Sequence, residues 1–358
     1  GSMSRQTGRD RRQPTGSPEK PFPGGPLPFV RANALEPFVS FLNEIGAPVE
    51  RLLRQARVPG SLLDDPEALL PVFSAYRFVE LAARREQMEE FGVVIGQRAS
   101  SFDRGGYGAV LQGSSTVYEF LRIGTRLIGE HNSGARMWLK PEGGMIRVSQ
   151  YLPGPPGPGS CIAELYTLVV TINTLRKILG PTWSPGEIRL LSGAEAFSGD
   201  PEIFGEAPIV TGQRHTSFTI SRSLMQRPVP GSHARSLQAE DSLLAAGRPM
   251  PADFEASVEQ LVVSLLNDGY PSIRTTADAA GMSLRTLQRR LAESGLTYTG
   301  LVSASRLRLA KSWLTESAMP IAEIATLLGY KEPTNFARAF RRQTGISPAS
   351  YRRTQAQG

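Results

Sequence analysis

Three polar side chains near the C-terminus have the types and spacing that suit contact with base pairs. Arg285, Gln288 and Arg289 recur at i, i+3 and i+4, so an α-helix would carry them on one face. An arginine can donate two hydrogen bonds to guanine, and a glutamine can pair with adenine. The sequence therefore predicts a helix that reads the edges of bases through these three residues.

A second helix with a basic face is predicted further along the chain. Phe336 and Phe340 recur at helical spacing and are expected to point inward. Four polar residues fall on the opposite face: Asn335, Arg338, Arg341 and Arg342.

The elements that would position both faces are two helix-turn-helix units. In the first, a short helix over 275–280 ends at Gly281, and Ser283 is a suitable N-cap for a helix over 284–293. In the second, the turn falls at Gly329, which lies 48 positions after Gly281. Glycine suits such turns because it tolerates a positive φ. A helix-turn-helix unit places its second helix in the major groove, so the pattern indicates DNA binding.

Residues 254–353 resemble the AraC/XylS family of bacterial transcription regulators. The resemblance rests on MSLRTLQRRLAESG in the first unit and on GY…FARAFRRQTGISPASYR in the second. It implies an all-α DNA-binding domain in which a helix over 299–314 holds the two units on one side of the duplex. The alternative is a helical bundle whose arginines only solvate its surface.

The resemblance also assigns individual contacts to DNA. The positions implied to read bases are Arg285, Gln288, Arg289, Thr334, Asn335 and Arg338. The positions expected to contact phosphates are Ser283, Thr286, Arg341 and Arg342. Ala337 occupies a position where related proteins often carry a polar group, so base readout by the second unit is expected to be weaker.

The middle of the chain predicts an α+β domain with an antiparallel sheet. Its expected helices cover 34–45, 48–55, 74–89, 116–129 and 163–179. Its expected strands cover 135–140, 145–151, 187–191 and 216–220. The glycine-rich run Gly105-Gly106-Tyr107-Gly108 is interpreted as a tight loop.

Residues 91–228 resemble the effector-binding region of the ornithine and arginine utilisation regulators, which is often labelled arabinose-binding-like. This resemblance implies a sensor without naming its signal. The near-neutral charge and the aromatic residues favour a small organic effector with apolar character, bearing one carboxylate or amine. Side chains assigned to such a pocket are Tyr107, His131, Trp138 and Tyr166.

Charge and composition divide the 358 residues into four parts. Residues 1–28 carry +3 and are expected to be a disordered leader, beginning with Gly1-Ser2-Met3 as an expression-tag remnant. The sensor domain is assigned to 29–228 and a linker with a short helix over 236–246 to 229–253. Residues 254–358 carry +5, which suits a phosphate partner, whereas the stretch between these charged ends carries −1.

Few residues could support catalysis or metal binding. The chain has one cysteine and three histidines, no His-x-x-x-His pair, no Gly-x-Ser-x-Gly motif and no Gly-Lys-Ser/Thr phosphate loop. We therefore expect no enzyme, metal or cofactor. An enzyme that also binds DNA and a middle domain that only dimerises or recruits a protein remain as rival hypotheses.

The expected partners are double-stranded operator DNA, a small-molecule effector, RNA polymerase and a second copy of the chain. No apolar run reaches the roughly 20 residues that span a bilayer, and no signal-peptide core is present. The sequence thus predicts a cytoplasmic bacterial activator that is associated with the nucleoid when it is bound to DNA.

Overall fold

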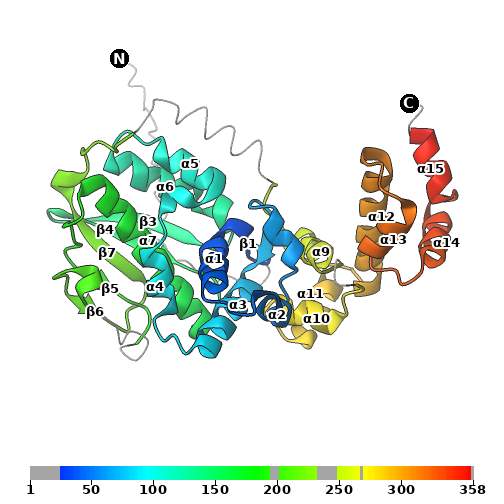
Figure 1. The fold of residues 1–358 in the computed structure, drawn as a ribbon, viewed down its shortest axis with the longest axis horizontal. Helices are drawn as coiled ribbons and strands as arrows, with labels where there is room; N and C mark the ends of the chain where they lie inside the picture. Colours follow the sequence, from blue (N-terminus) through cyan, green and yellow to red (C-terminus); the bar gives the residue numbers. More distant parts are fainter. Residues whose placement is uncertain (1–24, 194–200, 232–247, 267–268, 356–358) are drawn as a thin grey trace, which may run out of the picture.

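Figure 1 shows the computed structural model, which describes residues 25–193, 201–231, 248–266 and 269–355. Residues 1–24 of the predicted leader and the expected helix over 236–246 lie outside the described residues. Within the described part, no helix is both long and apolar enough to cross a bilayer.

The N-terminal domain contains a mixed sheet in the order β3-β4-β7-β5-β6. Its strands are β3 (Arg136–Glu142), β4 (Met145–Tyr151), β5 (Ile188–Arg189), β6 (Ile209–Val210) and β7 (Thr216–Ser221). All neighbouring strands are antiparallel except β5 and β6, which run parallel. A separate antiparallel pair joins β1 (Phe29–Arg31) to β2 (Leu69–Pro71). The α+β prediction with a largely antiparallel sheet is therefore confirmed.

The N-terminal domain also contains seven α-helices among the described residues (Figure 1). They are α1 (Glu36–Glu44), α2 (Val49–Gln55), α3 (Val72–Glu86), α4 (Phe91–Gln97), α5 (Gly105–Gln112), α6 (Val117–His131) and α7 (Pro158–Leu179). Helix α7 lies between two cores and is apolar on most of its circumference, as a fully buried helix must be. Tyr166 and Val170 pack with α1 to α4, whereas Leu168 and Leu175 pack toward the sheet, α5 and α6.

The C-terminal domain is all-α. Its helices are α9 (Phe254–Leu265), α10 (Ile273–Ala279), α11 (Leu284–Glu293), α12 (Tyr298–Glu316), α13 (Ile321–Leu327), α14 (Pro333–Thr344) and α15 (Pro348–Gln355). Helix α12 connects the first unit (α10 and α11) to the second unit (α13 and α14), and this confirms the double helix-turn-helix architecture.

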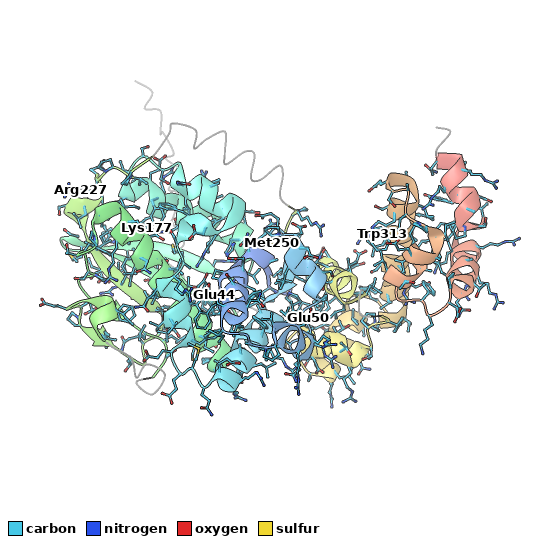
Figure 2. The ribbon with its side chains drawn as sticks, in the orientation of Figure 1. Glu44, Glu50, Lys177, Arg227, Met250 and Trp313 are labelled. Atoms are coloured by element: carbon cyan, nitrogen blue, oxygen red, sulfur yellow. The ribbon has the colours of Figure 1, made fainter. Side chains whose placement is uncertain are left out.

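The first unit shares a hydrophobic core with the N-terminal strands. In this shared core, Leu27, Phe29 and Leu69 pack with residues of α9 to α12. The backbone N–H of Leu27 also donates to the Ser257 hydroxyl of α9, at 2.9 Å. Met250, which precedes α9, packs partly on the same core (Figure 2).

Two segments differ from their sequence interpretation. Residues 25–28 were expected to end a disordered leader, but Leu27 is buried in the shared core. Gly105-Gly106-Tyr107-Gly108, expected as a tight loop, forms the first turn of α5. Gly108 lets this turn approach the preceding chain, because a β-carbon there would lie 2.3 Å from the carbonyl oxygen of Phe102. The glycine permits close packing of a helix, so the loop interpretation was wrong.

Candidate nucleic-acid interface and cavity

The first unit holds its recognition helix through local capping. The Ser283 hydroxyl accepts a hydrogen bond from the backbone N–H of Thr286 at 3.1 Å, and Gly281 adopts a φ of 65° in the turn. Leu287 and Leu291 of α11 are buried. Three predicted base-reading residues are exposed on the opposite face of α11: Arg285, Gln288 and Arg289. Arg289 also pairs with Glu293 one turn later, at 2.7 Å.

The second unit repeats this arrangement around a separate small core. Gly329 adopts a φ of 72°, and α14 buries Phe336 and Phe340. Its N-cap residue, Glu332, makes no side-chain capping bond. The five polar positions of α14 predicted to contact DNA are all exposed: Thr334, Asn335, Arg338, Arg341 and Arg342.

Arg306 of α12 joins the two units, and the sequence analysis did not identify it. Its guanidinium carbon lies 4.7 Å from the ring centroid of Tyr270 and 4.2 Å from that of Tyr330. It also donates to the carbonyl oxygen of Gly329, in the turn of the second unit, at 2.9 Å. Because Tyr270 precedes the first unit and Tyr330 belongs to the second turn, Arg306 fixes how the two units meet. Its contacts span several elements, so helical periodicity gives no signal for them.

The N-terminal domain also contacts the first unit at its turn. Phe73 of α3 lies so close to Gly281 that a β-carbon there would come within 2.5 Å of the ring. On α11, Arg290 is buried, stacks over Phe254 at 3.8 Å and donates to the carbonyl oxygen of Gly25. The first unit is thus held by the N-terminal domain on two sides.

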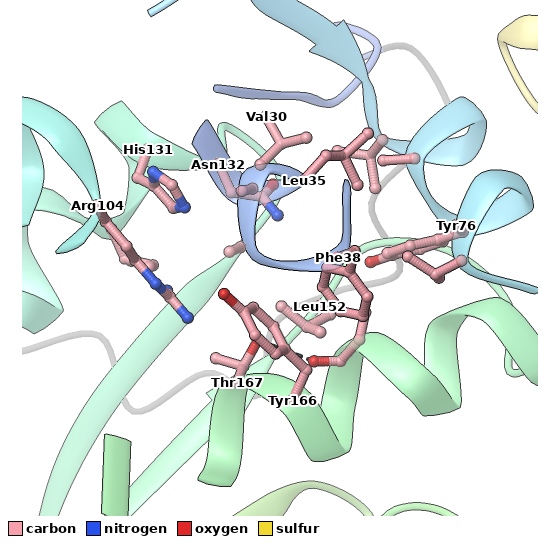
Figure 3. A pocket seen from close by; sticks show the side chains of 17 residues that line it. Val30, Leu35, Phe38, Tyr76, Arg104, His131, Asn132, Leu152, Tyr166 and Thr167 are labelled. Atoms are coloured by element: carbon pink, nitrogen blue, oxygen red, sulfur yellow. Dashed lines mark hydrogen bonds between the residues drawn. The ribbon is translucent and has the colours of Figure 1, made fainter. Parts of the chain in front are cut away.

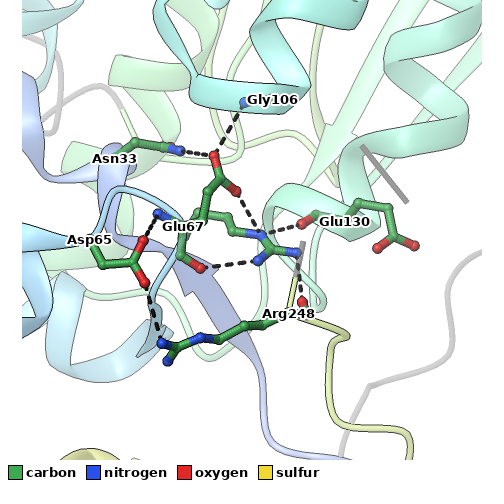
Figure 4. Close-up of polar contacts among 7 residues, drawn as sticks. Asn33, Asp65, Glu67, Gly106, Glu130 and Arg248 are labelled. Atoms are coloured by element: carbon green, nitrogen blue, oxygen red, sulfur yellow. Dashed lines mark hydrogen bonds and ion pairs between the residues drawn. The ribbon is translucent and has the colours of Figure 1, made fainter. Parts of the chain in front are cut away.

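A polar network anchors the start of the C-terminal domain to β1 (Figure 4). The guanidinium of Arg31 donates to the carbonyl oxygens of Glu67, Glu130 and Arg248 at 2.9 to 3.0 Å. Arg31 also pairs with the Glu67 carboxylate at 3.4 Å, and Arg248 pairs with Asp65 at 3.4 Å. This network fixes the chain immediately before α9.

A cavity of about 70 Å³ lies between α1, α3, α6 and α7. Most of its walls are apolar. The apolar side chains that line it are Val30, Ala34, Leu35, Phe38, Val72, Ala75, Val79, Ile128, Ala135, Leu152 and Ala163. The polar or amphipathic ones are Tyr76, Arg104, His131, Asn132, Tyr166 and Thr167.

Three of these polar side chains gather at one end of the cavity (Figure 3). They are Arg104, His131 and Tyr166. The guanidinium carbon of Arg104 lies 5.6 Å from the Tyr166 ring centroid. Burial lowers the pKa of His131 well below its usual range, and the nearby Arg104 and Arg31 cations lower it further, so His131 is neutral at pH 7.

Several polar atoms around the cavity are buried without a hydrogen-bond partner among the described residues. They are Nε and one terminal nitrogen of Arg104, Nδ1 of His131 and the hydroxyl of Tyr76. Burial raises the pKa of Tyr76, so it remains a neutral phenol. Buried polar atoms without a hydrogen-bond partner lower the stability of a protein. A cluster of them therefore indicates either a strained site or a site that binds a partner.

The four side chains predicted to bind an effector occupy three places. His131 and Tyr166 line the cavity. Tyr107 stacks on His131, with ring centroids 5.4 Å apart, and faces a smaller adjoining cavity. Trp138 on β3 is not brought to this site and lies edge-to-face against His215 at 5.0 Å.

Arg104, the buried cation of the cavity, was not identified from the sequence. It lies directly before α5 and the glycine-rich run that was interpreted as a loop. Nothing in its local sequence distinguishes it from the exposed Arg122.

Comparison with known proteins matches both domains. The family model described as "Arabinose-binding domain of AraC transcription regulator, N-term" matches residues 46–229, a little over half of the chain. The model described as "Helix-turn-helix domain" matches residues 276–354. In the described residues, no group of three or more His, Cys, Asp or Glu side chains is arranged to hold a metal ion.

Relatives along nearly the whole chain are transcription regulators. The HTH-type transcriptional regulator VirS of Mycobacterium tuberculosis is 24% identical over 90% of this chain and 96% of its own length. The ornithine utilization regulator of Pseudomonas aeruginosa is 24% identical over 91% of this chain and 96% of its own length. The crystal structure of the regulator CdpR from Pseudomonas aeruginosa is 23% identical, covers 86% of this chain and 96% of that chain, and superposes with a TM-score of 0.39.

The domain matches and the relatives agree with the exposed recognition helices. The chain is a DNA-binding transcriptional regulator rather than an enzyme. It belongs to the AraC family of transcription regulators, with an arabinose-binding-like N-terminal domain and a C-terminal pair of helix-turn-helix units.

Proposed function

We propose that a small organic effector, bound in the cavity, controls how this regulator binds its operator. The observation that carries the proposal is the position of β1. Val30 forms part of the cavity wall, whereas the adjacent Phe29 packs in the shared core with the first unit. Successive residues of a strand point to opposite faces, so one three-residue strand contacts both the cavity and the DNA-binding domain.

Helix α3 supports the same coupling. Val72, Ala75, Tyr76 and Val79 line the cavity, and Phe73 on the same helix abuts the turn of the first unit. A ligand that fits better when β1 or α3 shifts would favour one placement of α11 over another. Its effect on DNA binding is limited to its differential affinity for the two placements.

In this proposal, DNA is recognised by both units. The base-reading side chains are Arg285, Gln288, Arg289, Thr334, Asn335 and Arg338, and the phosphate contacts are Ser283, Thr286, Arg341 and Arg342. Exposure of nearly all of these residues in a basic domain supports the assignment. Activation through RNA polymerase, homodimerisation and action in the cytoplasm at the bacterial nucleoid belong to the same proposal.

The name of the family model does not identify the ligand. A sugar presents several hydroxyl groups that need hydrogen-bond partners, whereas most side chains around this cavity are apolar. The rival hypothesis is an N-terminal domain that only dimerises or recruits a protein.

Operator affinity with and without ligand separates the two hypotheses. DNA selected from a random library by the full-length protein supplies the operator, and a metabolite panel screened by thermal shift supplies ligands. We expect a ligand that raises the melting temperature to change operator affinity at least about fivefold, the lower end of allosteric coupling. The variant Ala75→Phe, which fills the cavity, should lose that response. A cavity-bound ligand that leaves operator affinity unchanged would favour the rival.

A further inference from the structure

Arg104 is a buried cation without a protein anion beside it. Only 7% of the residue is exposed. Within the described residues, no carboxylate oxygen lies within 4.0 Å of its guanidinium, and Nε and one terminal nitrogen have no hydrogen-bond partner. A buried charge is normally paired, because an ion that is removed from water without a partner loses its solvation.

The other buried charges of the N-terminal domain are satisfied. Arg31 donates to three carbonyl oxygens and pairs with Glu67. Arg147 pairs with Glu142 and Glu187 at 2.9 and 2.8 Å. Glu164 accepts hydrogen bonds from Leu191 and from the Ser192 and Thr216 hydroxyls. Arg104 differs from all three, so its missing partner is not a general property of this interior.

The acidic groups around the start of α5 are engaged with other residues. Asp103, which directly precedes Arg104, accepts from the backbone N–H of Ser100 at 2.9 Å. Glu67 accepts from the backbone N–H of Gly106 at 3.2 Å, at the start of α5, and pairs with Arg31 (Figure 4). It therefore serves the helix N-terminus and the β1 network, and leaves the guanidinium of Arg104 facing the cavity.

The rest of the cavity defines the body of the ligand. Phe38 and Leu152 form apolar walls near Tyr166 (Figure 3), and the Phe38 and Tyr166 ring centroids are 4.7 Å apart. His131, another polar group at the Arg104 end, is neutral and does not supply a competing charge. The small open volume suits a compact molecule. An apolar body with a single anionic group would fill these walls and complete the bonding of the guanidinium.

We infer that the effector is a small monocarboxylate with an apolar body, whose carboxylate pairs with Arg104. Guanidinium and carboxylate are matched in geometry and can form two parallel hydrogen bonds. The inference rests on the proposed function, because it names the class of effector that the cavity would take.

Binding of matched acids and amides to the full-length protein tests the inference. Hexanoate, cyclohexanecarboxylate and phenylacetate are compared with their primary amides, which have the same shape without the charge. By calorimetry, we expect at least one acid to bind about tenfold or more tightly than its amide, as a charge-assisted hydrogen bond provides. The variant Arg104→Gln should remove this preference, and Arg122→Gln, the same change at an exposed position, should keep it.

The stability of the ligand-free protein gives a second measurement. If Arg104 is unpaired until a ligand anion binds, the Arg104→Met variant should melt at a higher temperature than the unliganded wild type. The substitution removes an unpaired buried charge. A lower melting temperature would mean that the guanidinium is a structural group and would overturn the inference. Amides that bind as well as acids, acids that bind Arg104→Gln unchanged, or an absence of binding by every acid would also overturn it.

Failure of this inference is distinguishable from failure of the proposed function. A neutral ligand that occupies the cavity and changes operator affinity would refute the carboxylate and leave effector control standing. An acid that binds through Arg104 and leaves operator affinity unchanged would establish the site and refute effector control.

Discussion

The two helix-turn-helix units have the same local design but different surroundings. The first unit completes its core with Leu27, Phe29 and Leu69 of the N-terminal domain, and Phe73 abuts its turn. The second unit has a separate core of seven buried residues, contributed by α12, α13 and α14 (Figure 1). A ligand bound in the cavity would therefore act on the first unit directly. Among the described residues, the second unit is joined to the first through α12 and the residues around Arg306.

The largest expected effect comes from removing a core ring of the second unit. Phe340 is 2% exposed, and Phe340→Ala should cost about 3–5 kcal/mol of local stability. Because that core is small and separate, we expect the second unit to unfold while α9 and α11 stay protected. Hydrogen exchange measured by region checks this. Equal loss of protection in both units would show that they fold as one cooperative body.

The next effect compares equivalent arginines in the two recognition helices. Arg289 and Arg338 are each the sixth residue of their helix. Arg289→Ala should cost about 1–3 kcal/mol of affinity for the selected operator and much less on scrambled DNA. Arg338→Ala should cost less, because Ala337 stands where the first unit has Gln288. Fluorescence anisotropy titrations measure the affinity of each variant for both DNAs. An equal loss of affinity for operator and scrambled DNA would mean that Arg289 contacts a phosphate and not a base.

A smaller effect is expected at the joint between the units. Arg306→Met removes contacts with two tyrosine rings and should weaken operator binding by about 1–2 kcal/mol, since the recognition helices lose their fixed relation. Arg308→Met is the matched control, because Arg308 is exposed and forms only a surface pair with Glu259 at 2.8 Å. Circular dichroism should show both variants folded. If the two variants lose the same affinity, the joint does not position the helices.

The smallest effect compares the helix starts. Ser283→Ala removes the cap of α11 and should lower the free energy of unfolding by about 1 kcal/mol without DNA present. Glu332→Ala, at the uncapped start of α14, should change it by less than about 0.5 kcal/mol. Urea denaturation measures both, and a larger effect at Glu332 would contradict the capping assignment.

The structural features that could be predicted from the sequence are those whose physical causes lie within a few residues. The recognition helices follow from Ser283, the two turn glycines and the apolar spacing around Leu287 and Phe336, all of which act within a few residues. The exposure of the faces predicted to contact DNA has the same local cause, because these residues lie opposite the buried ones. Helix α5 was missed because its glycines suggested a loop, while contact with Phe102 favours the helix.

The cavity was less predictable than the DNA-binding surface. His131 and Tyr166 were identified among its polar residues, but Arg104 was not, because its significance lies in the partners it lacks. A missing partner is a property of three-dimensional packing, and single-sequence periodicity carries no information about it. Arg306 escaped notice for a related reason, since its two tyrosines lie on opposite sides of it in the sequence.

The shared core also limits how this regulator can be recombined. An exchange of DNA-binding domains at the linker would separate Phe254 and Val258 from Leu27 and Phe29, which fill the same core. A DNA-binding domain from another regulator would then pack poorly against Leu27 and Phe29. The β1 segment and α9 to α12 must therefore be exchanged together if the core is to fold. More than two hundred residues separate these two pieces in the sequence. Successful chimeras should be those that transfer both pieces at once.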